Sequence, residues 1–226
     1  MSSQLLSFLT KPSARLRRRL QRVEAALGVN DAKHRPLLGL HVRRGDACTD
    51  DPIQRRQKGR DCADLSAYMP HVRAMVRRHG YRAVYLATDS EEVVLEAKRA
   101  HPDLTWLVQP RDRSRYNIFN QSGITIEPVL WGTGDFQRVA DAGRRAGFSP
   151  AREFDEFMID TFLLGQGDGL VGNFANNMDR IAYALMAAHA TEGGTCLKPY
   201  HSLTGLWCND FQVQSGRTID GRRFWC

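Results

Sequence analysis

Hydrophobic positions follow two different periods along this chain. Between residues 14 and 27 they recur at helical spacing, as Leu16, Leu20, Val23 and Leu27, and Gly28 follows as a typical helix-ending residue. Residues 37–42, LLGLHV, are instead an almost continuous apolar run, which is typical of a strand covered on both faces. The pattern therefore predicts an amphipathic helix followed by a buried strand.

The same alternation continues through most of the chain. After a polar loop at 47–62, helical and strand patterns alternate twice, and a Gly-, Pro- and Arg-containing stretch at about 110–150 then predicts a long loop or insertion. Further helices are expected at 64–79, 90–101, 151–166 and 176–190, and further strands at 82–88, 104–109 and 169–174. This order predicts an α/β fold, a Rossmann-like parallel sheet with helices on both faces.

Composition adds a preference for anionic partners. The formal net charge is +7 and the pI about 9.4, and only five of the 32 basic residues are Lys. Arg suits bidentate phosphate binding, although solvated helix faces alone also explain such a charge. No segment approaches the roughly 18 apolar residues of a membrane span, and the charges near the N-terminus are in the wrong order for a signal peptide.

The five cysteines leave two interpretations open. They form no CxxC pair, which argues against a zinc site. Cys48–Cys62 and Cys196–Cys208 could be disulfides in an oxidising compartment, and free thiols are equally compatible with the spacing.

Polar side chains follow each predicted strand. Ligands of open α/β sheets bind outside the carboxyl ends of the strands, so these positions are candidate site residues. They are His41, Arg43, Arg44 and Asp46; Thr88, Asp89 and Ser90; Gln109, Arg111 and Asp112; and Asn173, Asn176 and Asn177. Arg43 and Arg44 are neighbours and should point to opposite sides, so only one can lead a diphosphate contact. The other should pair with a carboxylate, and Asp46 is the nearest.

Two of the predicted helices carry residues with two possible roles. Asn176 or Asn177 opens a helix after a strand, where backbone N–H groups and the helix dipole suit a phosphate, but Asn is also a common N-cap. Asp160 lies on the apolar stripe of its helix, where a carboxylate needs a partner. Its role is either structural, as an internal salt bridge or a distant cap, or functional, as a contact to the N1–H and 2-amino group of guanine.

Three ordered motifs, GLHVRRGD, YLATDS and MIDTFLLGQGDGLVGNFANNMDRIAYALM, resemble the GDP-fucose-binding half of the α1,6-fucosyltransferases. The resemblance covers Leu5 to about Met186, apart from the 110–150 region. It implies one lobe of a two-lobed (GT-B type), inverting, metal-independent enzyme with no cofactor. The corresponding division is a leading helical segment at 1–35, a nucleotide-sugar-binding domain at 36–190 and a tail of uncertain structure at 191–226.

The resemblance also implies roles for individual residues. His41 and Asp160 would contact guanine, Arg43 would bind the β-phosphate and stabilise the leaving GDP, and Asp51 would deprotonate the acceptor hydroxyl. The remaining expected donor-binding residues are Arg44, Asp46, Tyr68, Asp89, Asn176 and Asn177. Three departures stand out: Ala47 replaces a common Lys, Gly45 replaces a Thr, and Gly172 and Asp179 replace a Cys pair.

The resemblance implies GDP-fucose and a GlcNAc-containing glycan as substrates, and a partner lobe that this sequence does not show. It implies the Golgi lumen for a eukaryotic member and the cytoplasm for a bacterial one. Two alternatives remain. One is a non-catalytic GDP-sugar-binding or regulatory module, which Ala47 favours. The other, more remote, is a basic nucleic-acid-binding protein.

Overall fold

The computed structural model describes most of the chain in segments. These are residues 8–44, 48, 62–114, 149–174, 176–189 and 198–203, together with the backbone of 217–219 and 222–224. Two of the predicted site residues, Asp46 and Asp51, lie outside these segments, as do Cys196 and Cys208.

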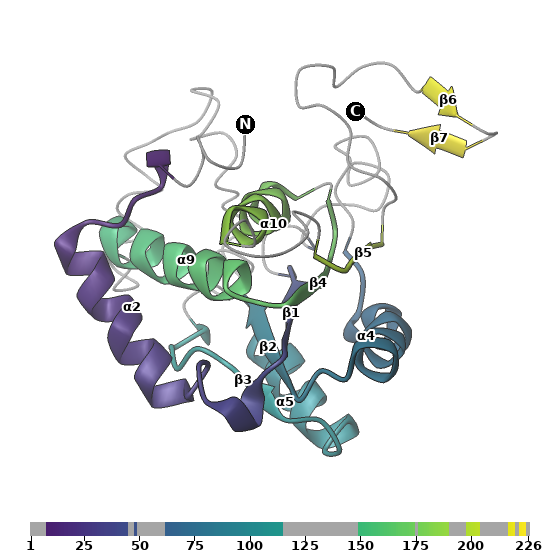
Figure 1. Ribbon diagram of the computed structural model, residues 1–226, viewed down its shortest axis with the longest axis horizontal. Helices are drawn as coiled ribbons and strands as arrows, with labels where there is room; N and C mark the ends of the chain where they lie inside the picture. The colour runs from purple at the N-terminus through teal and green to yellow at the C-terminus, as the bar shows by residue number, and fades with distance from the viewer. Residues whose placement is uncertain are drawn as a thin grey trace.

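A five-stranded sheet forms the centre of the molecule, and every strand pair in it is parallel (Figure 1). Its strands are β1 (Leu37–Val42), β2 (Ala83–Thr88), β3 (Trp106–Leu107), β4 (Gly169–Gly172) and β5 (Tyr200–Ser202), in the spatial order β3-β2-β1-β4-β5. The chain therefore builds outward from β1 in one direction and then in the other. The reversal of strand order between β1 and β4 is the topological switch point, where such sheets bind ligands.

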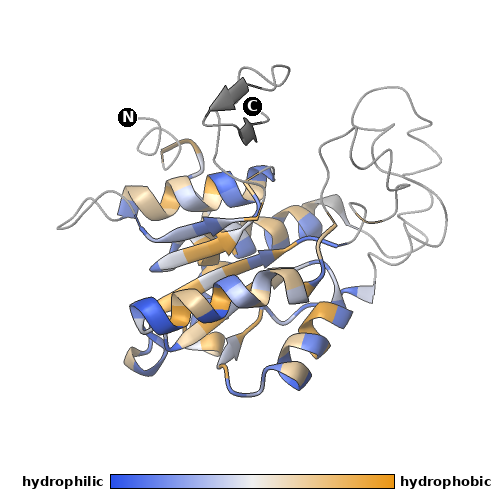
Figure 2. Cartoon of the chain, turned by 90° about the vertical axis from the view of Figure 1, so that its right-hand side faces the viewer, coloured by the Kyte–Doolittle hydropathy of each residue, from blue (hydrophilic) through white to orange (hydrophobic). Residues whose placement is uncertain are grey.

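Helices cover both faces of the sheet, as the sequence pattern predicts. One face carries α2 (Ala14–Leu27), α9 (Pro150–Gly165) and α10 (Asn177–His189), and the other carries α4 (Leu65–His79) and α5 (Glu91–Ala100). Figure 2 shows the apolar strands between these layers, with polar residues on the outer helix surfaces. The predicted α/β Rossmann-like class is confirmed.

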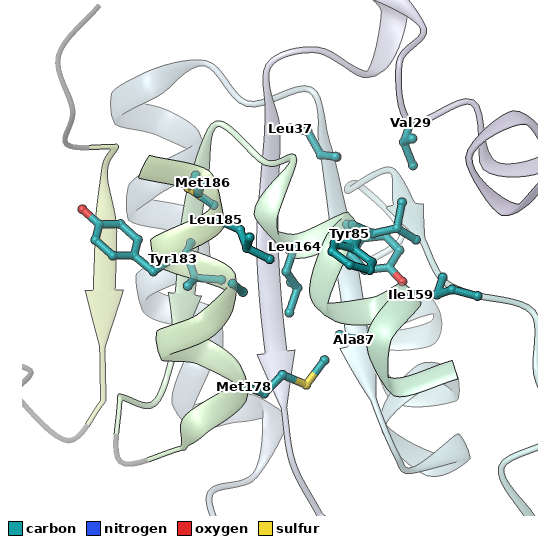
Figure 3. Close-up of a cluster of buried hydrophobic side chains, with 14 of the residues drawn as sticks. Val29, Leu37, Tyr85, Ala87, Ile159, Leu164, Met178, Tyr183, Leu185 and Met186 are labelled. Carbon is teal, nitrogen blue, oxygen red and sulfur yellow. The ribbon is translucent and has the colours of Figure 1, made fainter. Parts of the chain in front are cut away.

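Alternate residues of each strand face opposite layers. Leu37 of β1, Tyr85 of β2 and Leu170 of β4 belong to the core under α2, α9 and α10, where Figure 3 shows Tyr85 beside Leu164 of α9. Their neighbours Leu38, Val84 and Val171 belong to the core under α4 and α5. By this alternation His41 and Gly172 both face α9 and α10.

The predicted helix ends are explained by their caps. Gly28 ends α2 with a φ of 61°, a conformation that a side chain rarely adopts, and its N–H bonds to Glu24. The Ser90 hydroxyl accepts from the N–H of Val93 at 3.3 Å and so starts α5. Pro70 lies inside α4, which continues through it to His79.

Two parts of the sheet differ from the sequence pattern. The strand expected at 104–109 is only Trp106–Leu107, and Gln109 beyond it belongs to a buried polar network. Tyr200–Ser202, in the tail of uncertain structure, is the edge strand β5.

Arg217–Ile219 (β6) and Arg222–Phe224 (β7) pair as an antiparallel ribbon. In the described part of the chain, no helix combines the length and the apolar character that crossing a membrane requires.

Candidate nucleotide site

His41 lies at the carboxyl end of β1, beside the switch point, and is only 6% exposed. Its Nδ1 is 2.9 Å from Oδ2 of Asp179, a fully buried residue in the first turn of α10. Because an ionised carboxylate can only accept, Nδ1 donates in this hydrogen bond. The contact joins residues 138 positions apart and leaves Nε2 as the second polar atom of the ring.

Three carboxylates act on the protonation of His41. Burial by itself lowers the pKa of the imidazole, but the charge and hydrogen bond of Asp179 oppose this, and Asp89 and Asp160 add to that opposition. The net effect raises the pKa of His41 above its ordinary 6.5. Three carboxylates from three different segments therefore favour the imidazolium form at this end of β1.

Arg44, the second arginine after β1, contacts two carboxylates. The Arg44 guanidinium forms an ion pair with Asp64, which lies just before α4, and its backbone N–H donates to Asp89 Oδ1 at 2.8 Å. Arg44 is thus tied to the α4 side of the sheet, with Asp64 as its carboxylate partner. Arg43, which shares the strand parity of His41, is half-buried at the end of β1.

The start of α10 shows the capping role that the sequence left open for Asn176. Its side-chain oxygen accepts from the N–H of Met178 at 2.9 Å, which is an N-cap bond. The carboxamide nitrogen of the same side chain remains a potential donor, and Asn177 is exposed at the first helical position. Capping and phosphate binding are therefore compatible at this helix start.

Asp160 is the centre of a buried network on α9. Its Oδ2 forms an ion pair with Arg111 at 3.1 Å, and its Oδ1 accepts from the Tyr85 hydroxyl at 2.5 Å. Gln109, with its amide oriented to satisfy its neighbours, donates to the same Oδ1 at 2.8 Å. The internal salt bridge, one of the two expected roles of Asp160, is confirmed. The guanine contact stays a prediction.

Burial controls the protonation of this network. It raises the pKa of Asp160 above its ordinary 3.8, although Arg111, Tyr85 and Arg113 act in the opposite direction. It also raises the pKa of Tyr85 well above 10.0, so the phenol stays a proton donor. Arg111 further donates to the Thr88 carbonyl at 2.6 Å, which ties the network to the carboxyl end of β2.

Two further predicted site residues, Tyr68 and Asp89, differ in how far they are exposed to solvent. Tyr68 is 2% exposed within the core between α4 and the sheet, whereas Asp89 is half-buried just beyond β2. The sequence analysis did not select Asp179, the partner of His41, because it treated this position only as the replacement of a cysteine of the resembling family. The available signal was an acidic residue in the first turn of a helix with a buried face.

One of the two possible disulfides lies within the described residues. Cys48, six positions after β1, is bonded to Cys62 before α4, with 5.2 Å between the Cα atoms. The disulfide thus closes the segment that contains the predicted Asp51, and the oxidised interpretation of these two cysteines is the one the structure shows.

Comparison with known proteins gives matches among solved structures, and no protein-family model matches the sequence. A structure of POFUT1 in complex with GDP aligns at 15% identity and a TM-score of 0.43, over 83% of this chain and 46% of that one. A complex of POFUT1 with GDP-fucose aligns at 13% identity and a TM-score of 0.43, over 83% of this chain and 45% of that one. The apo form of POFUT1 aligns at 12% identity and a TM-score of 0.45, with the same two coverages. This chain spans about half the length of those proteins. Similarity at this level does not identify the ligand.

Proposed function

We propose that this domain binds GDP-fucose and supplies the donor site of a fucosyltransferase. The observation that carries the proposal is the juxtaposition at the switch point. His41, at the end of β1, is held by Asp179 at the start of α10, and Arg43 follows two residues later. An imidazole, a guanidinium and a helix start suit the base and the diphosphate of a nucleotide sugar. The three motifs shared with the α1,6-fucosyltransferases support the same choice.

In the proposed reaction, the acceptor hydroxyl attacks the anomeric carbon of fucose as the bond to GDP breaks. Arg43 stabilises the negative charge that develops on the leaving β-phosphate, together with N–H groups at the start of α10. Asp51, by its sequence position, takes the proton of the hydroxyl. We assign GlcNAc with an α1,6 linkage as the acceptor, and expect transfer to need no metal and to continue in the presence of a chelator.

Calorimetry tests the binding part of the proposal. GDP should bind in preference to ADP, and Arg43→Ala should weaken GDP binding by on the order of tenfold or more, because a charge-assisted phosphate contact is lost. Arg82→Ala is a matched control, since Arg82 contacts the Ala32 carbonyl at the opposite end of β2. Equal affinity for ADP and GDP, or an Arg43→Ala variant that binds GDP normally, would exclude this site.

A second candidate function is GDP-sugar binding without transfer. Ala47, in place of the Lys common in the α1,6-fucosyltransferases, removes a positive charge near the expected reacting centre. A glycosyltransfer assay with GDP-fucose and an N-glycan or chitin oligosaccharide separates the two functions. GDP binding without transfer, with no gain on Ala47→Lys, supports the non-catalytic module.

A further inference from the structure

Gly172 and Asp179 fit together as a pair. Gly172, the last residue of β4, faces α10, and a Cβ placed on it would lie only 2.8 Å from the Asp179 carboxyl carbon. Backbone conformation does not explain this glycine, since no left-handed φ is found there. The missing side chain instead leaves the space that the Asp179 carboxylate occupies beside His41. In Figure 3, the preceding residue Met178 lies beside the end of the central strand β1.

The Asp179 carboxylate is fully buried and only half satisfied. Its Oδ2 binds His41, and its Oδ1 has no hydrogen-bond partner among the described residues. An uncompensated carboxylate in this position would be costly, although the helix dipole offsets part of that cost. It would also repel an anion bound at the start of α10. A positive charge on His41 removes both difficulties.

We propose that Asp179 is a positioning residue of the nucleotide site, which holds His41 by Nδ1 and keeps the ring as an imidazolium. Nε2–H is then a charged hydrogen-bond donor toward the nucleotide, and the start of α10 carries no net negative charge. This inference rests on the proposed GDP site and adds a residue to it. It predicts that GDP binds best while His41 is protonated.

Other charges near His41 act in the same direction or are already paired. Asp89 beyond β2 and Asp160 on α9 both favour the imidazolium, and Arg111 neutralises much of the Asp160 charge. Arg43 is the cation that follows β1, two residues after His41. Among the described residues, Asp179 is the carboxylate that hydrogen-bonds the imidazole, so its removal should change the protonation of His41 most.

Histidine NMR and calorimetry of the whole chain test the inference. In the wild type, the pKa of His41 should lie above 6.5, and in Asp179→Asn it should be lower, because burial is then opposed only by Asp89 and Asp160. At pH 7 the variant should bind GDP on the order of tenfold more weakly, whereas at pH 5.5 the two proteins should differ less than about twofold. The ratio of the two affinities cancels the ionisation of GDP itself.

Two controls separate the possible failures. Gly172→Ala/Asp179→Ala refills part of the same space without charge, so it should reproduce the loss at pH 7 and the rescue by acid if Asp179→Asn folds poorly. Arg43→Ala should weaken GDP binding similarly at both pH values. An unchanged pKa of His41 in the variants, or a pH-independent affinity ratio, overturns the role of Asp179. A wild type that binds no GDP at either pH overturns the proposed function itself.

Discussion

Arg111 and Asp160 form an ion pair in which both side chains are almost completely excluded from solvent, at 5% and 3% exposure. Desolvation of two charges offsets much of their attraction, so the pair itself adds little net stability. Loss of one partner destabilises the fold, because the remaining charge is then buried without a partner of opposite charge. The pair therefore constrains the position of Asp160 and, through the Thr88 carbonyl, the carboxyl end of β2.

Substitution of Arg111 by Met should destabilise the domain strongly. Removal of one partner from a buried pair costs about 3–5 kcal/mol, and the measurement is urea denaturation at pH 7. A carboxyl whose folded pKa is raised, as for Asp160, favours folding fully below its ordinary 3.8 and loses that contribution as the pH rises through the folded value. The penalty of Arg111→Met should therefore shrink as the pH falls toward 4.

Asp160→Asn provides the control for this prediction. The amide has nearly the shape of the carboxylate but no charge, so Arg111→Met should cost less in the Asp160→Asn background than in the wild type. A double-mutant cycle measures the difference. Equal costs in both backgrounds, at all pH values, would show that Arg111 stabilises the fold by packing and its bond to the Thr88 carbonyl, and not by its charge on Asp160.

Gly172→Ala should destabilise the domain because its Cβ would overlap the Asp179 carboxylate. The expected cost is about 1–3 kcal/mol, as for other overpacked core positions. In an Asp179→Ala background the same substitution should be neutral or stabilising, since it then fills space. Thermal or urea unfolding of the four proteins gives the coupling energy, and additive effects would contradict the steric relationship.

The local patterns were sufficient to predict the central elements. β1, α2 and α5 carry their own signals, an apolar run, a helical repeat ending in Gly28 and a Ser90 cap, and these depend on neighbours in the sequence. β5 carries no such signal. It has three residues, it is partly exposed, and its pairing with Leu170–Gly172 of β4 supplies the hydrogen bonds that define it.

In the candidate site, too, local sequence patterns select some residues, whereas the partners of those residues depend on packing. The strand-end rule selected His41, Arg43 and Arg44 as candidates, and the opposite orientation of the two arginines stays a prediction. The actual partners, Asp179 for His41 and Asp64 for Arg44, depend on how helices pack on the sheet, which the spacing along the chain does not encode. For Asp160 the sequence predicted the need for a partner but not that Arg111 would fill it.

The stacked imidazoles of His71 and His201 should make the edge of the sheet sensitive to acid. The ring centroids are 3.6 Å apart and the ring planes are nearly parallel. Burial, together with the charge of the neighbouring His71, lowers the pKa of His201 below 6.5. A histidine with a lowered folded pKa stabilises the fold above 6.5 and loses that contribution as the pH falls through the lower value. Hydrogen exchange at Leu203, whose N–H bonds to the Gly172 carbonyl, should therefore accelerate below pH 6 relative to the core.

His71→Phe should reduce this acid sensitivity, because a protonated His201 would then face a neutral aromatic ring. His79→Phe changes another histidine of the same helix, one that does not stack on β5, and should leave the sensitivity intact. The same acid-induced exchange at Leu203 in His71→Phe and the wild type would assign the effect to other groups.

Asn176 offers a separation of capping from phosphate binding. Asn176→Asp keeps an oxygen for the N–H of Met178, so the free energy of unfolding should change little, whereas Asn176→Ala should lose about 1 kcal/mol. If the carboxamide nitrogen also donates to the diphosphate, Asn176→Asp replaces that donor with a negative charge and should weaken GDP binding more than Asn176→Ala does. Denaturation should therefore rank Asn176→Asp as the more stable variant, and calorimetry should rank Asn176→Ala as the variant that binds GDP more tightly. GDP affinity that instead follows helix stability, with Asn176→Asp close to the wild type, would limit Asn176 to its role as the cap of α10.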